Sequence, residues 1–479
     1  MNKSLEIRKL LEQLEAGGVR YCHWKSNIRL AKSLAAETDL DLLVSAENKP
    51  LFDETIQHAG CRKMRNHSLD TFPCVEDYFL ADGDGKKTYH LHVHTKVIFG
   101  HKHLKEYQPP LETECLKVRN NKANVKVPTP ECELLIHILR MAVKTFSPIR
   151  LLFPRCIPAP NRYPSKADME ELNYLQTASE PKIFGAFVSG LPFKIDKEAI
   201  IRIGMGEKER LNIILWRIAR SMRHYKRLSF ATILWRLVKA NLMRVLQKIC
   251  FRKPQNKKYL ANGFTVAIVG ADGAGKTTVL QKVEEFFNAR IYVERFYLGS
   301  NRPGVSSRFF RITTLPIKSV SIRLGRFLKS AIKIADAIVL FQEWFYLRKR
   351  KKRFRKAREM AKEGKLVFLE RFPVPGIQDA GYEIINRSYK GFLDKLRHQI
   401  LSEYNNFTGA DVVIFLSIDP QNAIKRKPDH DIEEVKRKAE EMEKQWQKIG
   451  ASRHVKIDAS QPLEEVVAKT INAVWDTRL

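Results

Sequence analysis

The segment GADGAGKTT, residues 270–278, carries the strongest chemical signal in the sequence. Gly270, Gly275, Lys276 and Thr277 meet the pattern G-x-x-x-x-G-K-[ST], between one apolar run and the next. Glycines at this spacing let backbone N–H groups wrap phosphate oxygens, and a following helix N-terminus adds partial positive charge. Lys276 would reach the β- and γ-phosphates of ATP, and the Thr277 hydroxyl would ligate Mg²⁺. The predicted phosphate-binding loop consists of Gly270, Ala271, Asp272, Gly273, Ala274, Gly275, Lys276, Thr277 and Thr278.

A second segment, GKLVFLERFP at 364–373, reads as a buried strand that ends in Glu370 and Arg371. Functional groups in open α/β sheets lie at the carboxyl ends of the strands. We therefore expect Glu370 to assist the metal or the acceptor and Arg371 to clamp a phosphate. A surface ion pair is the alternative for these two residues.

Further along, the run DVVIFLSID at 411–419 predicts another strand, and Lys425, Arg426 and Lys427 follow it. A basic cluster between a strand and a charged helix could close over phosphates as a lid. A last strand, HVKIDAS, is expected at 454–460 before a final helix.

This order of motifs resembles the thymidylate kinase family of P-loop nucleoside monophosphate kinases, over most of 264–475. The matching segments are GADGAGKTT, ERF, IDPQNAIKR and IDAS. The resemblance implies that Lys276 and Thr277 handle ATP and Mg²⁺, that Asp272 and Arg371 face the acceptor, and that Arg426 is a lid arginine. It implies catalysis by Lys276, Glu370, Arg371 and Arg426.

Two departures limit what the resemblance implies. Glu370 stands where the family has aspartate, and PVPGIQDAGYE replaces the Ser-Ser-x-Ala-Tyr-Gln type of stretch that reads thymine. Gln378 could substitute for part of it. The resemblance therefore implies a phosphotransferase and not a preference for dTMP.

The front of the chain contains a second group of polar residues. Asp39 and Asp41 alternate with leucines in DLDLLV, so both carboxylates are expected on one strand face, where they suit a divalent cation. The strand TYHLHVHTKV places His90, His92 and His94 on one face as well. These histidines could bind a transition metal, replace a missing acid, or form a polar face without a metal.

Ser26, a probable helix, and then Asp39-x-Asp41 resemble the nucleotidyltransferase superfamily. Lys25 stands where that superfamily has glycine, and its third acid is not evident. Active nucleotidyl transfer and a degenerate domain that binds a substrate or partner both remain open.

The net charge of +32 is concentrated in two segments. Residues 201–260 hold 16 Lys+Arg against 2 Asp+Glu, and residues 302–365 hold 19 against 4. Both mix charge with large apolar residues, and Arg348 to Arg353 are six consecutive basic residues. They are either solvated helices or a basic amphipathic surface for anionic lipid or a polyanionic substrate. Nucleic acid is a weaker alternative, because no binding motif accompanies the charge.

These features predict three parts. Residues 1–145 form a nucleotidyltransferase-like α/β domain, residues 146–260 a proline-rich and then basic helical connector, and residues 261–479 a kinase-like domain with a basic insertion at 302–365. The last domain is expected to have a P-loop parallel sheet flanked by helices. The amphipathic start, the scattered cysteines and the lack of an 18-residue apolar run favour a cytoplasmic protein, in one version peripheral to the inner face of the membrane. A homodimer is left open.

The leading functional hypothesis is an ATP-dependent kinase that transfers the γ-phosphate to a nucleoside monophosphate or a related acceptor. One alternative is a kinase or nucleotidyltransferase acting on a sugar, glycan or lipid-linked acceptor at the membrane. The other is a nucleotide-gated scaffold that binds membrane or nucleic acid.

Overall fold

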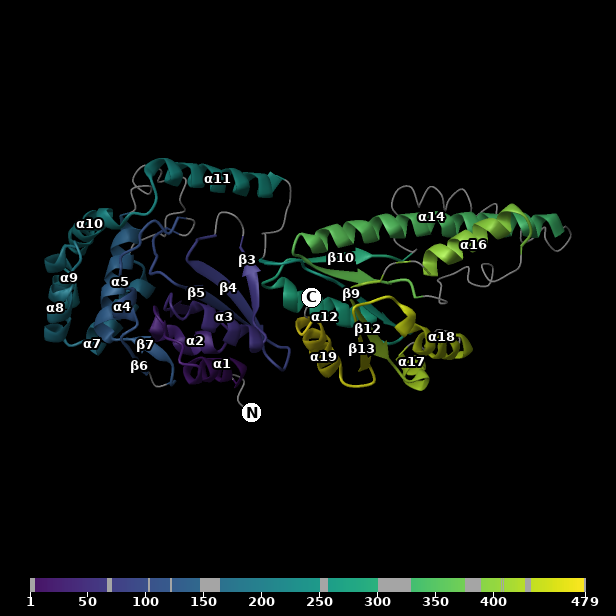
Figure 1. The fold of residues 1–479 in the computed structure, drawn as a ribbon, viewed down its shortest axis with the longest axis horizontal. Helices are drawn as coiled ribbons and strands as arrows, with labels where there is room; N and C mark the ends of the chain where they lie inside the picture. The colour runs from purple at the N-terminus through teal and green to yellow at the C-terminus, as the bar shows by residue number, and fades with distance from the viewer. Residues whose placement is uncertain are drawn as a thin grey trace. The chain divides into compact units, whose positions relative to one another are not determined.

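The computed structural model describes residues 5–66, 71–101, 104–120, 123–146, 164–249, 257–299, 329–374, 389–405, 407, 409–426 and 432–477. The chain divides into two compact units, residues 1–82 with 87–257 and residues 83–86 with 258–479 (Figure 1). Gln378, Lys427, the insertion up to residue 328 and most of the proline-rich stretch lie outside the described residues.

The first unit is built on a mixed sheet. Its strands run in the order β1-β2-β5-β4-β3, and only the β2–β5 pair is parallel. They span β1 Tyr21–His23, β2 Leu40–Val44, β3 Arg62–Arg65, β4 Val75–Ala81 and β5 Thr88–His94. A separate pair is formed by β6 Val118–Asn120 and β7 Lys126–Pro128.

Side-chain alternation along β2 gives this sheet two different faces. Leu42 and Val44 pack into a core with the first helices, whereas Leu43 packs into a core with α5 and the helices that follow. The helices are α1 Leu5–Ala16, α2 Leu30–Leu34, α3 Lys49–His58, α4 Glu112–Cys115, α5 Pro130–Thr145, α7 Lys166–Ala178, α8 Pro181–Gly190, α9 Lys197–Gly204, α10 Leu211–Ser221 and α11 Phe230–Ile249, with 3₁₀ turns at Asn27–Arg29 and Met222–Tyr225.

The helical part that the sequence suggested as a connector belongs to this first unit. Buried residues of α7 to α10 share one apolar core with α5. Almost every residue of α5 from Leu134 to Val143 is buried. The front sheet covers only one side of this helix, and the helices α7 to α10 pack against the rest. The segment from 164 to 249 is therefore part of a compact body.

The second unit has a five-stranded, fully parallel sheet in the order β10-β11-β9-β12-β13. Its strands are β9 Thr265–Gly270, β10 Val293–Tyr297, β11 Leu366–Glu370, β12 Val412–Ser417 and β13 Arg453–Asp458, with the short β8 Lys258–Tyr259 before them. The strands expected within 364–373, at 411–419 and at 454–460 are confirmed, the apolar run before the glycine pattern forms β9, and the sheet is parallel as expected.

Helices cover both faces of this sheet. Phe287 of α12 packs near Phe368 and Trp475 on one face, whereas α14, α16 and α18 share a core with Val269 and Leu369 on the other. The helices are α12 Lys276–Asn288, α14 Lys329–Lys362, α16 Phe392–Asn405, α17 Pro420–Arg426, α18 Ile432–Gln445 and α19 Leu463–Trp475, with a 3₁₀ turn at Trp446–Lys448. Among the described residues, no helix is long and apolar enough to cross a bilayer.

Candidate functional site

The loop between β9 and α12 has the backbone that the glycine pattern predicts. Gly273 and Gly275 have φ angles of +87° and +77°, which favour glycine. A Cβ on Gly273 would lie 2.8 Å from the Ala423 carbonyl oxygen, so the close approach to α17 also requires glycine there. Because α12 begins at Lys276, the first N–H groups of the helix have no acceptor in a preceding helical turn.

A pocket opens at this loop, beyond the carboxyl end of β9. Lys276 folds over the loop, with Nζ 2.7 Å from the Ala271 carbonyl oxygen and 3.7 Å from Asp272 Oδ1. Arg371, which has a left-handed φ of +52°, lines the same pocket. The lining residues are Ile268, Val269, Gly270, Ala271, Asp272, Lys276, Arg350, Arg371, Phe372, Pro373, Val374, Tyr404, Lys438 and Met442. The structure thus brings five predicted site residues together: Gly270, Ala271, Asp272, Lys276 and Arg371.

Arg350 is a pocket residue that the sequence analysis did not single out. Its side chain is 5% exposed, its Nε donates to the Leu298 carbonyl over 2.8 Å, and it also bonds the Tyr404 hydroxyl. Its helix has a buried stripe at helical spacing, made by Leu347, Phe354, Ala357 and Ala361. That spacing, visible in the sequence, marks Arg350 as the inward member of the basic run.

The six basic residues from 348 to 353 therefore do not form one free surface, which counts against the alternative in which the whole run faces lipid. Arg350 is buried, Lys351 pairs with Glu403 at 2.9 Å, and Arg353 donates to the Tyr297 carbonyl over 3.1 Å. A continuous helix turns by about 100° per residue, so six neighbours point in all directions.

The predicted lid arginine does not line the pocket. Arg426 is exposed, and its Nη2 donates to the Ala459 carbonyl over 3.0 Å. Lys438 of α18 lines the pocket instead. Lys438 is therefore a pocket cation that the sequence analysis missed within a charged helix, and the lid role of Arg426 stays a prediction.

Glu370 forms an ion pair with an arginine and does not line the pocket. Arg295 lies with Nη2 2.9 Å and Nε 3.1 Å from Glu370 Oε2, and the same guanidinium is 3.4 Å from Glu284. The pocket lining includes the neighbouring Arg371 but not Glu370. Its assignment to a metal or acceptor stays a prediction.

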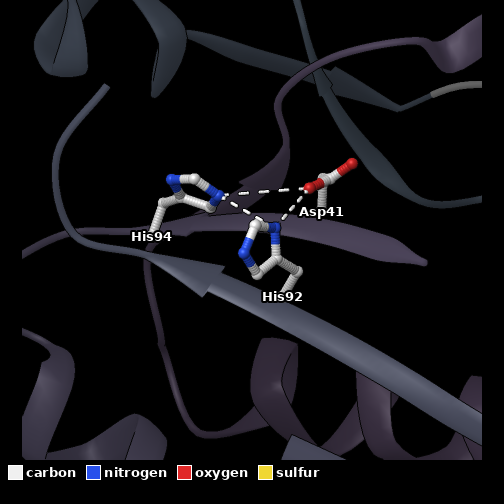
Figure 2. A group of neighbouring side chains, drawn as sticks. All are labelled: Asp41, His92 and His94. Carbon is white, nitrogen blue, oxygen red and sulfur yellow. Dashed lines mark hydrogen bonds and ion pairs between the residues drawn. The ribbon is translucent and has the colours of Figure 1, made fainter. Parts of the chain in front are cut away.

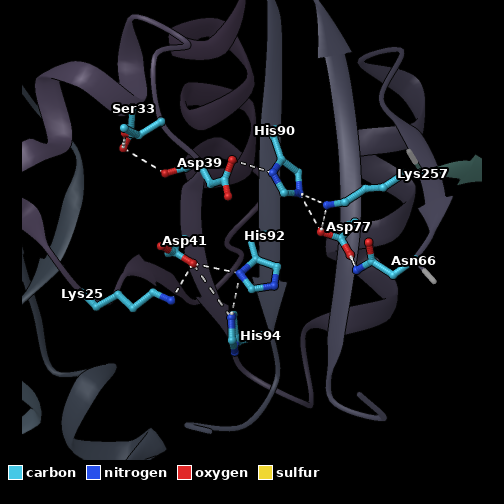
Figure 3. A network of polar contacts seen from close by, with 11 residues as sticks. Lys25, Ser33, Asp39, Asp41, Asn66, Asp77, His90, His92, His94 and Lys257 are labelled. Carbon is cyan, nitrogen blue, oxygen red and sulfur yellow. Dashed lines mark hydrogen bonds and ion pairs between the residues drawn. The ribbon is translucent and has the colours of Figure 1, made fainter. Parts of the chain in front are cut away.

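A second group of polar side chains lies on the front sheet, where the three histidines share one face as expected (Figure 3). His90 bridges two acids, with Nδ1 2.7 Å from Asp39 Oδ1 and Nε2 2.6 Å from Asp77 Oδ1. Asp77, which is 3% exposed, also accepts from Lys257 over 2.5 Å. The sequence analysis missed both Asp77, an acid inside the apolar run of β4, and Lys257, in a stretch that reads as a linker.

The other half of this group centres on Asp41. Its Oδ1 lies 2.8 Å from Lys25 Nζ and 2.9 Å from His92 Nδ1, and His94 is the next residue on the same face of β5. Burial alone would raise the pKa of Asp41, but Lys25 and His92 outweigh it and hold that pKa well below its usual range. Burial lowers the pKa of His92 and of His94, which favours the neutral form of both imidazoles.

Cations gather around this group. Burial, together with Lys25, lowers the pKa of Lys105 to about 7. Lys105 has a left-handed φ of +46°, and Arg140 Nη1 lies 3.4 Å from the Ser26 hydroxyl. Strongly shifted lysines are common at functional sites. The front unit therefore presents a second candidate site with positive charge.

No family model matches the chain. Two relatives come from Escherichia coli (strain K12), the uncharacterized ATP-binding proteins YghS and YghR. YghS is 26% identical over 228 residues, which are 44% of this chain and 91% of YghS. YghR is 29% identical over 232 residues, which are 44% of this chain and 86% of YghR.

Among solved structures, a deoxyadenosine kinase from M. mycoides with bound dATP aligns at 19% identity and a TM-score of 0.26, over 43% of this chain and 97% of the kinase. The same kinase with dCTP aligns at 17% identity and a TM-score of 0.27, over 43% of this chain and 97% of that one. TM-scores of this size do not establish a common fold.

Proposed function

We propose that the second unit is an ATP-dependent phosphotransferase, which moves the γ-phosphate of ATP to a nucleoside monophosphate or a related anionic acceptor. The observation that carries this proposal is the pocket at the end of β9, where Lys276, Arg350, Arg371 and Lys438 share one space with the phosphate-binding loop. The ATP-binding description of the relatives YghS and YghR supports the choice of nucleotide.

Each part of the pocket has a physical role in phosphoryl transfer. The glycine backbone and the first turn of α12 donate N–H groups to phosphate oxygens. Lys276 and Arg350 stabilise negative charge on the group in transit, and Arg350 is oriented for this by its bond to Leu298. Tyr404 and Phe372 shield these charges from water, which strengthens the attraction.

The donors available near the loop fit a magnesium ion bound together with the nucleotide. The Thr277 hydroxyl lies exposed in the first turn of α12, and the Asp272 carboxylate lines the pocket. Hard oxygen donors of this kind suit Mg²⁺, which would neutralise phosphate charge. Glu370 could join them only by leaving Arg295.

The charge of the pocket favours an anionic acceptor. A nucleotide triphosphate engages the loop and Lys276, which leaves Arg371 for a second anionic group. A neutral sugar would offer the Arg371 guanidinium no negative charge to pair with. A phosphorylated sugar or lipid-linked phosphate remains the alternative acceptor.

The test is an acceptor screen with γ-labelled ATP, covering nucleoside monophosphates, free and phosphorylated sugars, and glycans. We expect transfer by the full-length protein and a loss of about 10²-fold or more in Lys276→Ala, because an electrostatic clamp is removed. Lys282→Ala is the matched control, since Lys282 is an exposed lysine of the same helix. Near-normal turnover in Lys276→Ala, or no transfer to any acceptor, would reject the proposal, and the latter would favour the scaffold alternative.

We also infer that α11 lies on an anionic membrane surface. Its inner face is buried through Ile233, Leu237 and Ala240. Its outer face carries six large apolar side chains, each at least 36% exposed, within about 140° of the helix surface. They are Phe230, Leu234, Trp235, Val238, Leu242 and Val245.

The positive charge of the surrounding segment favours anionic lipid as the partner of this face. The segment 201–260 that contains α11 has 16 Lys+Arg and only 2 Asp+Glu. Each basic residue near an anionic bilayer contributes roughly 1 kcal/mol, while the apolar face enters the interface. A membrane-bound kinase would meet a lipid-linked phosphate acceptor directly.

A further inference from the structure

The Asp41 carboxylate and the imidazoles of His92 and His94 converge on one point (Figure 2). Asp41 Oδ1 is 2.9 Å from His92 Nδ1, His92 Nδ1 is 3.2 Å from His94 Nε2, and His94 Nε2 is 4.0 Å from Asp41 Oδ1. Ligand atoms at about 2.0–2.1 Å around a tetrahedral metal ion lie about 3.3 Å apart. The three separations bracket that value, so small side-chain rotations would seat an ion.

We propose that Asp41, His92 and His94 bind a divalent transition-metal ion of the Zn²⁺ type. Two imidazole nitrogens and one carboxylate oxygen suit Zn²⁺, Co²⁺, Ni²⁺ or Fe²⁺, whereas Mg²⁺ prefers oxygen ligands only. Three protein ligands leave a fourth position for water or an exogenous ligand. This metal site is independent of the phosphotransfer proposed for the second unit.

Strand register explains why these three residues meet. The parallel β2–β5 pairing sets Asp41 opposite His92, and His94, two residues further along β5, lies on the same face. Asp39, which the sequence paired with Asp41 as a metal ligand, instead contacts His90. The three histidines on this strand face therefore have two different roles. His92 and His94 belong to the proposed metal site, whereas His90 contacts the carboxylates of Asp39 and Asp77.

Lys25 competes with the ion for Asp41. Its ammonium lies 2.8 Å from Asp41 Oδ1 and 4.9 Å from the centroid of the Trp24 ring. This charge neutralises the carboxylate when no ion is bound, and a metal ion must displace it. Removing the ammonium should therefore strengthen metal binding, which a purely structural role of the three residues does not explain.

The experiment titrates Co²⁺ into the nucleotide-free, full-length protein and follows its visible absorption, with Zn²⁺ and Mg²⁺ as competitors. We expect one Co²⁺ site that Zn²⁺ empties and millimolar Mg²⁺ does not. His92→Ala should weaken binding at least about tenfold. Lys25→Gln should strengthen it severalfold, and His90→Gln, on the same strand face, should leave it unchanged.

Circular dichroism and thermal unfolding of each variant identify those that fold. The stronger Co²⁺ binding expected for Lys25→Gln cannot result from unfolding, because unfolding would weaken binding. Equal affinity in the wild type and a folded His92→Ala variant would overturn the proposal. So would a thiolate charge-transfer band, which would place the ion at cysteine, or the absence of Co²⁺ binding in both the wild type and Lys25→Gln.

Discussion

Arg350 donates its Nε–H to the carbonyl of Leu298 over 2.8 Å, which fixes the guanidinium at the edge of the phosphate pocket. This hydrogen bond fixes the orientation of one residue of the basic helical run at the pocket. An oriented fork of donors can hold a phosphate in one geometry, which a freely rotating ammonium cannot.

Replacing Arg350 by lysine should therefore impair turnover although the charge is kept. We expect Arg350→Lys to lower kcat/KM for ATP about tenfold or more, because the fork and its bond to Leu298 are lost. The control is Arg348→Lys, since Arg348 stacks on Trp344 at 4.2 Å and does not line the pocket. Equal kcat/KM in the two folded variants would remove Arg350 from the mechanism.

Gly273→Ala should weaken nucleotide binding. Its φ of +87° and the Ala423 carbonyl oxygen, 2.8 Å from an added Cβ, both oppose a side chain, and we expect a cost of about 1–3 kcal/mol in the loop. Calorimetry with ATP would measure the affinity. Gly190→Ala is the comparison, because no atom lies within 4 Å of an added Cβ there. A Gly273→Ala variant with wild-type affinity would contradict the loop geometry described above.

Lys105 should react with amine-directed reagents at neutral pH. Burial and Lys25 lower its pKa to about 7, so Lys105 is uncharged in about half of the molecules at pH 7. An ordinary lysine has a pKa near 10.4 and is almost fully charged at that pH. The fraction modified, followed by peptide mass spectrometry, should rise with pH around 7.

Two charged neighbours of Lys105 determine in which direction its reactive pH should move when they are replaced. Lys25→Gln removes a repelling charge and should move the reactive pH upward, whereas Asp41→Asn removes an attracting charge and should move it downward. A midpoint near 10 in the unmodified protein, or shifts of the opposite sign, would exclude this environment.

The outer face of α11 should direct the protein to anionic vesicles. We expect flotation with phosphatidylserine-containing vesicles but not with neutral ones, and a loss of flotation in the double variant Trp235→Glu with Leu242→Glu. Both side chains are exposed, at 65% and 56%, so the fold should persist. Phe392→Glu, at a residue 66% exposed in the second unit, controls for added charge.

Competitor DNA distinguishes lipid from nucleic acid in this experiment. Salt weakens both kinds of binding and cannot separate them. Flotation that persists with DNA supports the lipid surface. Tight DNA binding without flotation at low salt would replace it by a nucleic-acid surface.

The parts of the fold that sequence predicts are those whose signals are local. The apolar runs before Gly270 and through Leu369 predict buried parallel strands, and the glycine spacing predicts the loop between β9 and α12. The alternation of TYHLHVHT places His92 and His94 on one face. Each of these follows from the backbone geometry of a few neighbouring residues.

The residues that sequence did not predict depend on tertiary contacts. Arg350 and Lys438 lie in charged helices, and only the packing of those helices brings them to the pocket. Asp77 and Lys257 are far apart in the chain, yet they share one ion pair. The pairing of Asp39 with His90 rather than with a metal at Asp41 depends on strand register, which no short pattern encodes.

Arg295 lies between Glu370 and Glu284, at 2.9 Å from one carboxylate and 3.4 Å from the other. A half-buried guanidinium that loses its partner is strongly destabilising, but this one has an alternative partner within reach. Arg295 already pairs with both acids, so it would keep the carboxylate of Glu284 if Glu370 turned away. The second ion pair thus lowers the cost of moving the carboxylate at the end of β11, because the guanidinium would not be left without a partner.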